Sequence, residues 1–512
     1  MSSKNIALIS ICKQLRYDFV FELGIAQLVG FLRDSGYSVK MFFYHNDETA
    51  DEIAKITNEN FDYYAFSVYE TNAKMIYRVA ERIKDTNPNS YIVCGGQFST
   101  IYYLEIFNEC NAIDYIILGD GEIPFNYLLE GNSIESYPYI ASRLDEKNDY
   151  KIFVNDDVNW KPAEDYYHIR HGKWCVHNLL SKNNVCSGFC TFCCRQMSSK
   201  KAIFKPIECI LDEIIHIHNK YNITAFYFVD DDLFDPNDNI AKTRIMELCE
   251  QLIKLNLGVF FYFYTKVTAF NDTVEDNMML DKLFLAGFVN VYLGLESGNN
   301  DDLKLYNKQH NVNDNYKAIE LFTRHHFNIT IGFININPWS TLENLKENYV
   351  FLKNIEALEI KLYICRFLSI YKNSPLYSLL ERDGLFGDEY DYLNTTKYQY
   401  KDKKIIPIIQ FLNEYFLHED SLSLYTEGYT WPRFMSYYKK AIRINRDLLS
   451  FGDEVDLLKN EYLNILDNYF NIIYIENDIE KAKRDYEKFR DLFLANDHKK
   501  NELVAKISNS HL

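Results

Sequence analysis

Three cysteines lie close together in the middle of the chain, at a spacing that suits a metal centre. They are Cys186, Cys190 and Cys193, and the segment CSGFCTFC places them in a C-x-x-x-C-x-x-C pattern. Three thiolates on one short loop can each bind one iron of a cubane four-iron cluster. The fourth iron, which has no protein thiol nearby, is then open to an outside ligand. The spacing therefore predicts a 4Fe-4S cluster with one exchangeable iron site.

A structural zinc site is the alternative for the same thiols. Structural zinc takes four ligands, usually as two C-x-x-C pairs with a longer spacer, and the chain contains no second pair. Cys194 directly follows Cys193, and adjacent side chains point in different directions, so we expect Cys194 to be a bystander and not a fourth ligand. Its presence leaves open which of the two thiols is the third cluster ligand.

The cysteine pattern, with an aromatic residue directly before the third cysteine, resembles the radical S-adenosylmethionine (radical SAM) superfamily. In that family S-adenosylmethionine chelates the open iron through its amino and carboxylate groups, and an electron from the cluster cleaves it to a 5′-deoxyadenosyl radical. The resemblance implies that Cys186, Cys190 and Cys193 hold the cluster and that Phe192 abuts the adenine. It also implies an external electron donor such as flavodoxin or ferredoxin.

Length and composition are those of a large intracellular enzyme. The 512 residues correspond to roughly three domains of about 150 residues each. The N-terminus has no apolar signal core, and no stretch approaches the roughly 20 apolar residues that span a bilayer, so we expect a cytoplasmic protein without membrane contact. The net charge of −18, from 73 acidic and 55 basic residues, argues against a nucleic-acid substrate, because phosphate contacts need clustered Lys and Arg.

Six strand-like runs alternate with helical segments over residues 165–385 and predict an open partial (β/α)6 barrel that begins just before the cysteine loop. The runs are KWCVHNLL, AFYFVDDDLF, GVFFYFYTK, VNVYLGLESG, NITIGFININ and EIKLYICRFLSIY. In such barrels the chemistry collects at the C-terminal ends of the strands. The strand-end residues are therefore the candidates for binding S-adenosylmethionine.

Three strand ends match the superfamily: DDDLF, LGLESGNNDDLKLYNK and FININPWSTLENL, although Asn337 in the last stands where glycine is usual. The resemblance implies that Asp230 and Asp231 hold the methionine ammonium and that Glu296 and Ser297 face the ribose or the methionine moiety. Lys266 ends the third strand, where a basic residue would suit the methionine carboxylate. The ordinary alternatives stay open: an acidic residue at a strand end can cap the following helix, and Lys266 can be a solvated lysine. The sequence assigns no catalytic side chain.

The first 140 residues predict a Rossmann-like domain, because short apolar runs alternate with helical patterns as in a parallel sheet. The segments FSVYETN, VCGGQFST and IDYIILGDGEIPF resemble the cobalamin-binding domain that precedes the barrel in one radical SAM subfamily. That resemblance implies that Ser67, Gly95 and Gly96 line the slot for the nucleotide tail of cobalamin. The D-x-H-x-x-G signature for a lower cobalt ligand is absent, since no histidine precedes His45. A degenerate Rossmann-like domain that only packs on the barrel is the alternative.

The complete prediction is an α/β chain with a cobalamin-type Rossmann-like domain at 1–140, a partial radical SAM barrel at 165–385 and a helical region at 386–512. Its implied activity is cobalamin-dependent methylation of an unactivated carbon in a peptide or small metabolite. Two alternatives remain. One is cobalamin-independent radical epimerisation, cyclisation or rearrangement, and the other is a noncatalytic iron-sulfur or zinc scaffold protein.

Overall fold

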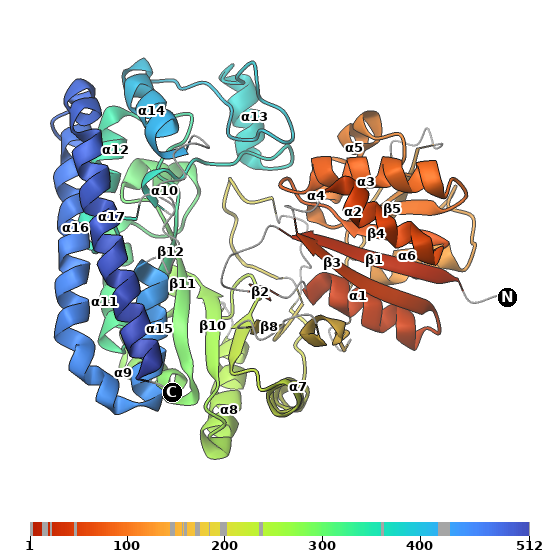
Figure 1. Ribbon diagram of the computed structural model, residues 1–512, viewed down its shortest axis with the longest axis horizontal. Coiled ribbons are helices and arrows are strands. Elements are labelled where there is room, and N and C mark those ends of the chain that lie inside the picture. The colour runs from red at the N-terminus through yellow and green to blue at the C-terminus, as the bar shows by residue number, and fades with distance from the viewer. Residues whose placement is uncertain are drawn as a thin grey trace.

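Two sheets of six strands each organise the part of the chain that the structure describes, and a helical region follows them (Figure 1). The computed structural model describes residues 4–12, 19–20, 23–45, 49–143, 149–155, 157, 161–168, 175–183, 185–194, 202–234, 239–359, 363–417 and 431–510. The predicted fold class, an α/β chain with a Rossmann-like first domain, a parallel barrel sheet and a helical C-terminal region, is confirmed.

The N-terminal sheet has the strand order β3-β1-β4-β5-β6-β7. Its strands are β1 (Asn5–Cys12), β3 (Ser38–His45), β4 (Tyr63–Ser67), β5 (Tyr91–Gly95), β6 (Tyr115–Ile117) and β7 (Ile140–Ser142). All neighbours pair in parallel except β7, which runs antiparallel to β6 at the edge, where doubly wound sheets commonly accept such a strand. The strand order reverses between β1 and β4, and ligands of open α/β sheets bind at the carboxyl ends of strands beside such a reversal.

Helices cover both faces of this sheet because apolar side chains alternate along its strands. On β1, Ile6 and Leu8 join the core that contains α1 (Leu23–Asp34) and α6 (Glu122–Leu129). Ala7 and Ile9 join the opposite core. That second core contains α2 (Ala50–Ala54), α3 (Ala73–Thr86), α4 (Gln97–Ile101) and α5 (Tyr103–Glu109). This period of two is the ordinary side-chain alternation of a strand that is buried on both faces.

The second sheet is parallel throughout, in the order β12-β11-β10-β9-β8-β2. Its strands are β2 (Phe19–Val20), β8 (Cys175–Leu179), β9 (Ala225–Phe228), β10 (Phe260–Thr265), β11 (Phe288–Glu296) and β12 (Asn328–Phe333). Five of the six predicted barrel runs are therefore strands. The sixth place is taken by β2, which comes from the N-terminal part of the chain and pairs with β8.

The sixth predicted run, residues 359–371, forms only a single parallel bridge between Phe367 and Ile336 beyond the end of β12, and its residues 360–362 lie outside the described part of the chain. The physical reason is that its backbone turns before it reaches the sheet. The amides of Tyr363 and Ile364 donate to the carbonyl of Glu359 at 3.1 and 3.0 Å, so they are not available to a ladder. The expectation of a full sixth strand at this place was wrong.

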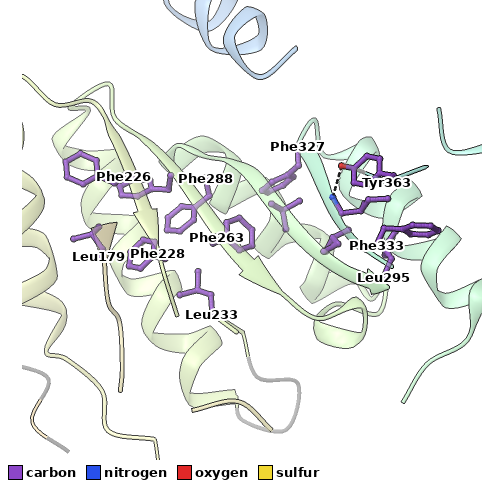
Figure 2. Close-up of a cluster of buried hydrophobic side chains, with 14 of the residues drawn as sticks. Leu179, Phe226, Phe228, Leu233, Phe263, Phe288, Leu295, Phe327, Phe333 and Tyr363 are labelled. Atoms are coloured by element: carbon purple, nitrogen blue, oxygen red, sulfur yellow. Dashed lines mark hydrogen bonds between the residues drawn. The ribbon is translucent and has the colours of Figure 1, made fainter. Parts of the chain in front are cut away.

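The barrel sheet buries aromatic side chains on its outer face, under the helices. These helices are α7 (Ile207–Tyr221), α8 (Asn239–Leu255), α9 (Val274–Ala286), α11 (Val312–Arg324) and α12 (Leu342–Asn354). The short helices α10 (Asn300–Leu305) and α13 (Pro375–Arg382) pack in a separate cluster. Phe226, Phe228, Phe263 and Phe288 come from neighbouring strands and lie together (Figure 2). Phe261 stacks on Phe288 with ring centroids 4.6 Å apart. The intervening positions on the other face are tyrosines that stay partly exposed, as at β10, where Tyr262 and Tyr264 alternate with phenylalanines.

The C-terminal region is helical, as predicted. It contains the short helix α14 (Ile406–Leu412) and the longer helices α15 (Trp431–Ile444), α16 (Gly452–Tyr474) and α17 (Ile479–Asn509), which lie on the side of the barrel away from the N-terminal sheet (Figure 1). Tyr349 of α12 donates to the Asp467 carboxylate of α16 at 2.6 Å, and Tyr462 donates to Glu359 at 2.8 Å. These bonds tie α16 to the barrel. Among the described helices, none combines the length and the apolar character needed to cross a bilayer.

Removing one ring of the outer aromatic core tests this packing. Phe261 is completely buried, so Phe261→Ala leaves a cavity, and we expect it to lower the free energy of unfolding by about 3–5 kcal/mol. Leu285→Ala on α9 is the control, because Leu285 is 66% exposed and its loss leaves no cavity. Urea denaturation followed by circular dichroism measures both variants. Equal effects of the two substitutions would contradict the packing described above.

Glu122 at the start of α6 offers a test that depends on pH. Its side chain is buried, and this burial raises its pKa to about 7. The folded chain then binds this proton more tightly than the unfolded chain, so stability falls as the pH rises from the ordinary glutamate range through 7. We expect Glu122→Gln to raise the free energy of unfolding at pH 8 and to give no such gain at pH 4. Urea denaturation at both values measures the difference, and a gain independent of pH would argue against a titrating Glu122.

Candidate functional site

The cysteine loop follows β8 directly, at the C-terminal end of the strand, as predicted. Cys186, Cys190 and Cys193 are all partly buried. A Cβ placed on Gly188 would lie 3.3 Å from Cys186 Sγ and 3.7 Å from Cys190 Sγ, so these two sulfurs converge over a residue that has no side chain. The amide of Cys193 donates to the carbonyl of Cys190 at 3.1 Å and turns the third cysteine back toward the first two.

A single metal ion and a cubane cluster need different arrangements of the thiols on this loop. Among the described residues, no three His, Cys, Asp or Glu side chains meet closely enough to hold one common ion. A cubane cluster instead takes each thiolate on a different iron, which suits sulfurs spread along a loop.

A turn from another part of the barrel forms the second wall of the cysteine loop. This turn, residues 305–308, follows α10 and runs beside residues 189–191 of the loop. The amide of Thr191 donates to the carbonyl of Tyr306 at 3.1 Å, and its hydroxyl donates to the carbonyl of Leu305 at 2.6 Å. The side chain of Asn307 donates to the carbonyl of Phe189 at 2.9 Å. Three hydrogen bonds therefore hold the cysteine loop in place.

Cys194 points toward the N-terminal domain. Its Sγ accepts a hydrogen bond from Nε2 of Gln97 at 3.1 Å, and its carbonyl accepts one from Nδ2 of Asn373 at 3.2 Å. Gln97 is the first residue of α4 and directly follows Gly95 and Gly96. The contact favours Cys193 over Cys194 as the third cluster ligand, and it links the two sheets at their carboxyl ends.

Lys266 lies at the cysteine loop, as its position at the end of β10 predicted. Its Nζ donates to the hydroxyl of Ser187, between the first two cysteines, and lies 3.6 Å from Oδ2 of Asp232. Its Cε is 3.6 Å from the position of a Cβ on Gly188. The ammonium is therefore placed for a carboxylate or another anion at the cluster.

Glu296 also lies at this site, in an unusual backbone conformation. Its φ of +68° is in the left-handed region that residues with a side chain rarely adopt, and such strain tends to gather at functional sites. Its Oε1 is 3.3 Å from Nζ of Lys308. Two paired glycines give this carboxylate room, because a Cβ on Gly294 would lie 3.0 Å from Oε1 and one on Gly332 would lie 3.2 Å from Oε2.

Two of the predicted ligands are built into the scaffold instead. The carboxylate of Asp230 is 2% exposed and accepts hydrogen bonds from the amides of Ser181 and Lys182 at 3.0 and 3.1 Å. Ser297 is completely buried, and its hydroxyl lies 2.8 Å from Oδ1 of Asn348. These contacts favour a structural role for both side chains. Their predicted contact with S-adenosylmethionine stays a prediction that this geometry does not support.

The other two predicted ligands of the barrel are partly exposed. Asp231 follows Asp230 beyond the end of β9, and it is partly exposed whereas Asp230 is buried. Phe192 packs edge-to-face on Tyr306, with ring centroids 5.5 Å apart. That contact fixes the ring next to the cysteines.

The predicted cobalamin residues gather at one edge of the N-terminal sheet. The amide of Val68 donates to the carbonyl of Gly95 at 3.1 Å, which joins the ends of β4 and β5. A Cβ on Gly96, whose φ is +95°, would lie 3.5 Å from the hydroxyl of Ser67. A Cβ on Gly95 would meet no atom of the described residues within 4 Å, so they leave open space in front of this glycine. The edge fits a bulky ligand that approaches the backbone closely. Residues 13–18, which follow β1, lie outside the described part of the chain.

Three residues that join these elements were not predicted from the sequence. Lys308 lies in the segment that supplied Glu296, and Gln97 directly follows the paired glycines, so both were near a recognised motif. Glu70 accepts hydrogen bonds from the hydroxyls of Tyr371 at 3.3 Å and Thr395 at 3.1 Å, across the two sheets. Burial raises the pKa of Glu70. No sequence signal marks a partner more than 300 residues away.

Comparisons with known proteins agree with this arrangement. The family model described as "B12 binding domain" matches residues 15–129, and the one described as "Radical SAM superfamily" matches residues 180–351. The anaerobic magnesium-protoporphyrin IX monomethyl ester cyclase of Rubrivivax gelatinosus is 24% identical over 459 residues, which are 86% of this chain and 76% of that protein.

Two solved structures share the fold. The cobalamin-dependent S-adenosylmethionine radical enzyme OxsB, solved with aqua-cobalamin and S-adenosylmethionine, superposes with a TM-score of 0.72 at 19% identity, covering 99% of this chain and 80% of that one. The radical S-adenosylmethionine methyltransferase TsrM of Kitasatospora setae, solved with tryptophan and a SAM analogue, gives 0.61 at 14% identity over 82% and 90% of the two chains. The chain thus belongs to the cobalamin-binding branch of the radical SAM superfamily, whose enzymes use a 4Fe-4S cluster, S-adenosylmethionine and cobalamin.

Proposed function

We propose that this enzyme methylates an unactivated carbon of a small metabolite or a peptide in a cobalamin-dependent radical reaction. One observation carries the proposal: Gln97, beside the open space at Gly95, contacts Cys194, beside the cluster cysteines, at 3.1 Å. A methyl donor bound at the first place and a radical generated at the second can reach the same substrate carbon. The methyltransferase activity named for TsrM, whose fold this chain shares, also supports it.

We assign separate roles to the cofactors and to the side chains around them. Cys186, Cys190 and Cys193 hold the cluster, and when bound, the cluster with S-adenosylmethionine supplies the hydrogen-abstracting radical while cobalamin supplies the methyl group. The protein binds and orients the cofactors and the substrate, and it excludes water from the site. Lys266 and Glu296 bring charges of opposite sign to the place where the zwitterionic methionine end is expected.

The remaining predicted residues are assigned to parts of the cofactors by their positions in the fold. We assign Phe192 to the adenine and Asp231 to the methionine ammonium, and Ser67, Gly95 and Gly96 to the nucleotide tail of cobalamin. We place the domains at 1–140, 165–385 and 386–512. Two elements pack outside their own domain: β2 pairs with β8 of the barrel sheet, and Tyr392 packs in the core of the N-terminal sheet. A protein such as flavodoxin or ferredoxin would deliver the electron.

A radical cyclisation or rearrangement is the second candidate. The relative that is aligned over 86% of this chain is named a cyclase and not a methylase. The same cofactor pair can serve such a reaction, because the chemistry resides in the cofactors and the substrate pocket selects the outcome. The two candidates differ in their products. Methylation consumes a second S-adenosylmethionine to regenerate the methyl donor and releases S-adenosylhomocysteine, whereas cyclisation does not.

The third cluster ligand can be identified directly. We expect Cys193→Ser to lose the cluster and Cys194→Ser to keep about four irons per chain after anaerobic reconstitution, because the Cys194 thiol is turned toward Gln97. Iron and sulfide analysis with the visible absorption spectrum measures this. The reverse pattern would make Cys194 the ligand and would contradict the proposed set.

The cobalamin site and the reaction can be tested together. We expect the wild-type chain, expressed with cobalamin, to retain about one cobalt beside about four irons and to form S-adenosylhomocysteine and 5′-deoxyadenosine with substrate. Gly95→Val should abolish cobalt retention without unfolding the chain, because its side chain would enter the open space in front of Gly95.

Gly452→Val is the matched control, since a Cβ there makes only an ordinary contact of 3.7 Å with the Tyr438 hydroxyl, far along the chain from the site. A wild-type enzyme that retains iron but no cobalt would contradict the cobalamin-dependent proposal. Cobalt retention with 5′-deoxyadenosine but no S-adenosylhomocysteine would favour cyclisation or rearrangement.

A further inference from the structure

We propose that Lys308 is a positioning residue of the cluster site, whose ammonium, held by Glu296, places a fixed positive charge beside the cluster cysteines and raises the reduction potential of the cluster. The inference concerns the cluster alone and does not depend on whether the enzyme methylates its substrate. Lys308 ends the turn at residues 305–308, in the segment LGLESGNNDDLKLYNK that also carries Glu296.

Three hydrogen bonds attach the turn to the cysteine loop. Asn307 binds the carbonyl of Phe189 at 2.9 Å, and Thr191 binds the carbonyls of Tyr306 and Leu305 at 3.1 and 2.6 Å. The Lys308 amide closes the turn by donating to the carbonyl of Leu303 at 2.9 Å. The backbone of Lys308 is thus held next to the loop by bonds that do not involve its own side chain.

The side chain of Lys308 is confined between the barrel sheet and the loop. It is 10% exposed, and a Cβ on Gly294 of β11 would lie 3.3 Å from its Nζ. Glu296 holds the ammonium from the other side at 3.3 Å. The Glu296 carboxylate is a direct countercharge for the ammonium in this poorly solvated place. The ion pair therefore keeps the charge at the site.

A fixed cation near the thiolates affects one step in particular. Reduction adds one negative charge to the cluster, and a nearby positive charge in a poorly solvated site stabilises the reduced form more than the oxidised form. Lys266 is a second cation at the loop, but it approaches from β10, donates to Ser187 and is paired with Asp232 at 3.6 Å. Lys308 approaches the loop from the α10 side, so its effect on the cluster potential can be measured separately from that of Lys266.

The test is a redox titration of the reconstituted cluster without S-adenosylmethionine, followed by electron paramagnetic resonance. Lys308→Met removes the charge and keeps the length of the side chain. At the potential that half-reduces the wild-type cluster, we expect its reduced-to-oxidised ratio to fall about tenfold, which is a shift of about 59 mV to lower potential. Lys308→Arg keeps the charge and should stay within about twofold of the wild type.

Lys304→Met is the matched control, because Lys304 is an exposed lysine of α10 four residues earlier in the chain. Iron and sulfide content confirms that each variant carries the cluster. A potential for Lys308→Met equal to that of Lys304→Met would overturn the proposal. An equal fall in Lys308→Arg and Lys308→Met would also overturn it, because packing and not charge would then be the cause.

Glu296→Gln decides the question if Lys308→Met does not hold a cluster. It keeps the shape of the side chain and the cation but removes the countercharge, so the potential should rise, opposite to the shift in Lys308→Met. An unchanged or lower potential in Glu296→Gln would contradict the proposed electrostatic role. A wild-type chain that forms the cluster but shows no methyl transfer would leave this reading of Lys308 intact and would reject only the proposed function.

Discussion

The pairing of two lysines with carboxylates beside the cysteine loop is the interaction around which this end of the barrel is arranged. Charged groups that are taken out of water need partners of opposite charge, or their burial is costly. Lys266 reaches the loop from β10 and Lys308 from the turn after α10, and each carries its own carboxylate, Asp232 and Glu296. The cations are therefore held in place before any cofactor binds, and little reorganisation is needed when charge develops.

The parallel sheet makes this arrangement possible because its two faces are so different. The outer face is a continuous aromatic core, with Phe261 and Phe288 stacked under the helices. The inner face carries tyrosines and, at its carboxyl end, the paired glycines Gly294 and Gly332. A side chain at either glycine would crowd the Glu296 carboxylate, which would have to shift, so the position of the charged pair depends on two residues that have none. Packing on one face thus holds a polar site on the other.

The two cofactor regions are joined by direct contacts between the carboxyl ends of both sheets. Gln97 of the N-terminal domain binds Cys194, and Glu70 of the same domain accepts hydrogen bonds from Tyr371 and Thr395. These bonds set the distance between the glycine edge of the N-terminal sheet and the cluster loop. A reaction that uses groups bound at both places requires such a fixed distance, because misplacement of reacting groups by even about 1 Å is costly in rate.

The sequence by itself determined the features that are local in the chain. The cysteine spacing, the alternation of strands and helices, and the glycines after β5 are each readable within a few residues, and they predicted the fold class and the place of the loop. One error, the sixth strand, arose because an apolar run does not show that its backbone turns on itself at Glu359. Only the tertiary structure decided which of two neighbours is buried. Asp231 and Glu296 are partly exposed, whereas Asp230 and Ser297 beside them are buried in hydrogen-bond networks. The reason is that burial beyond a strand end depends on partners that are distant in the sequence, such as Ser181 for Asp230 and Asn348 for Ser297.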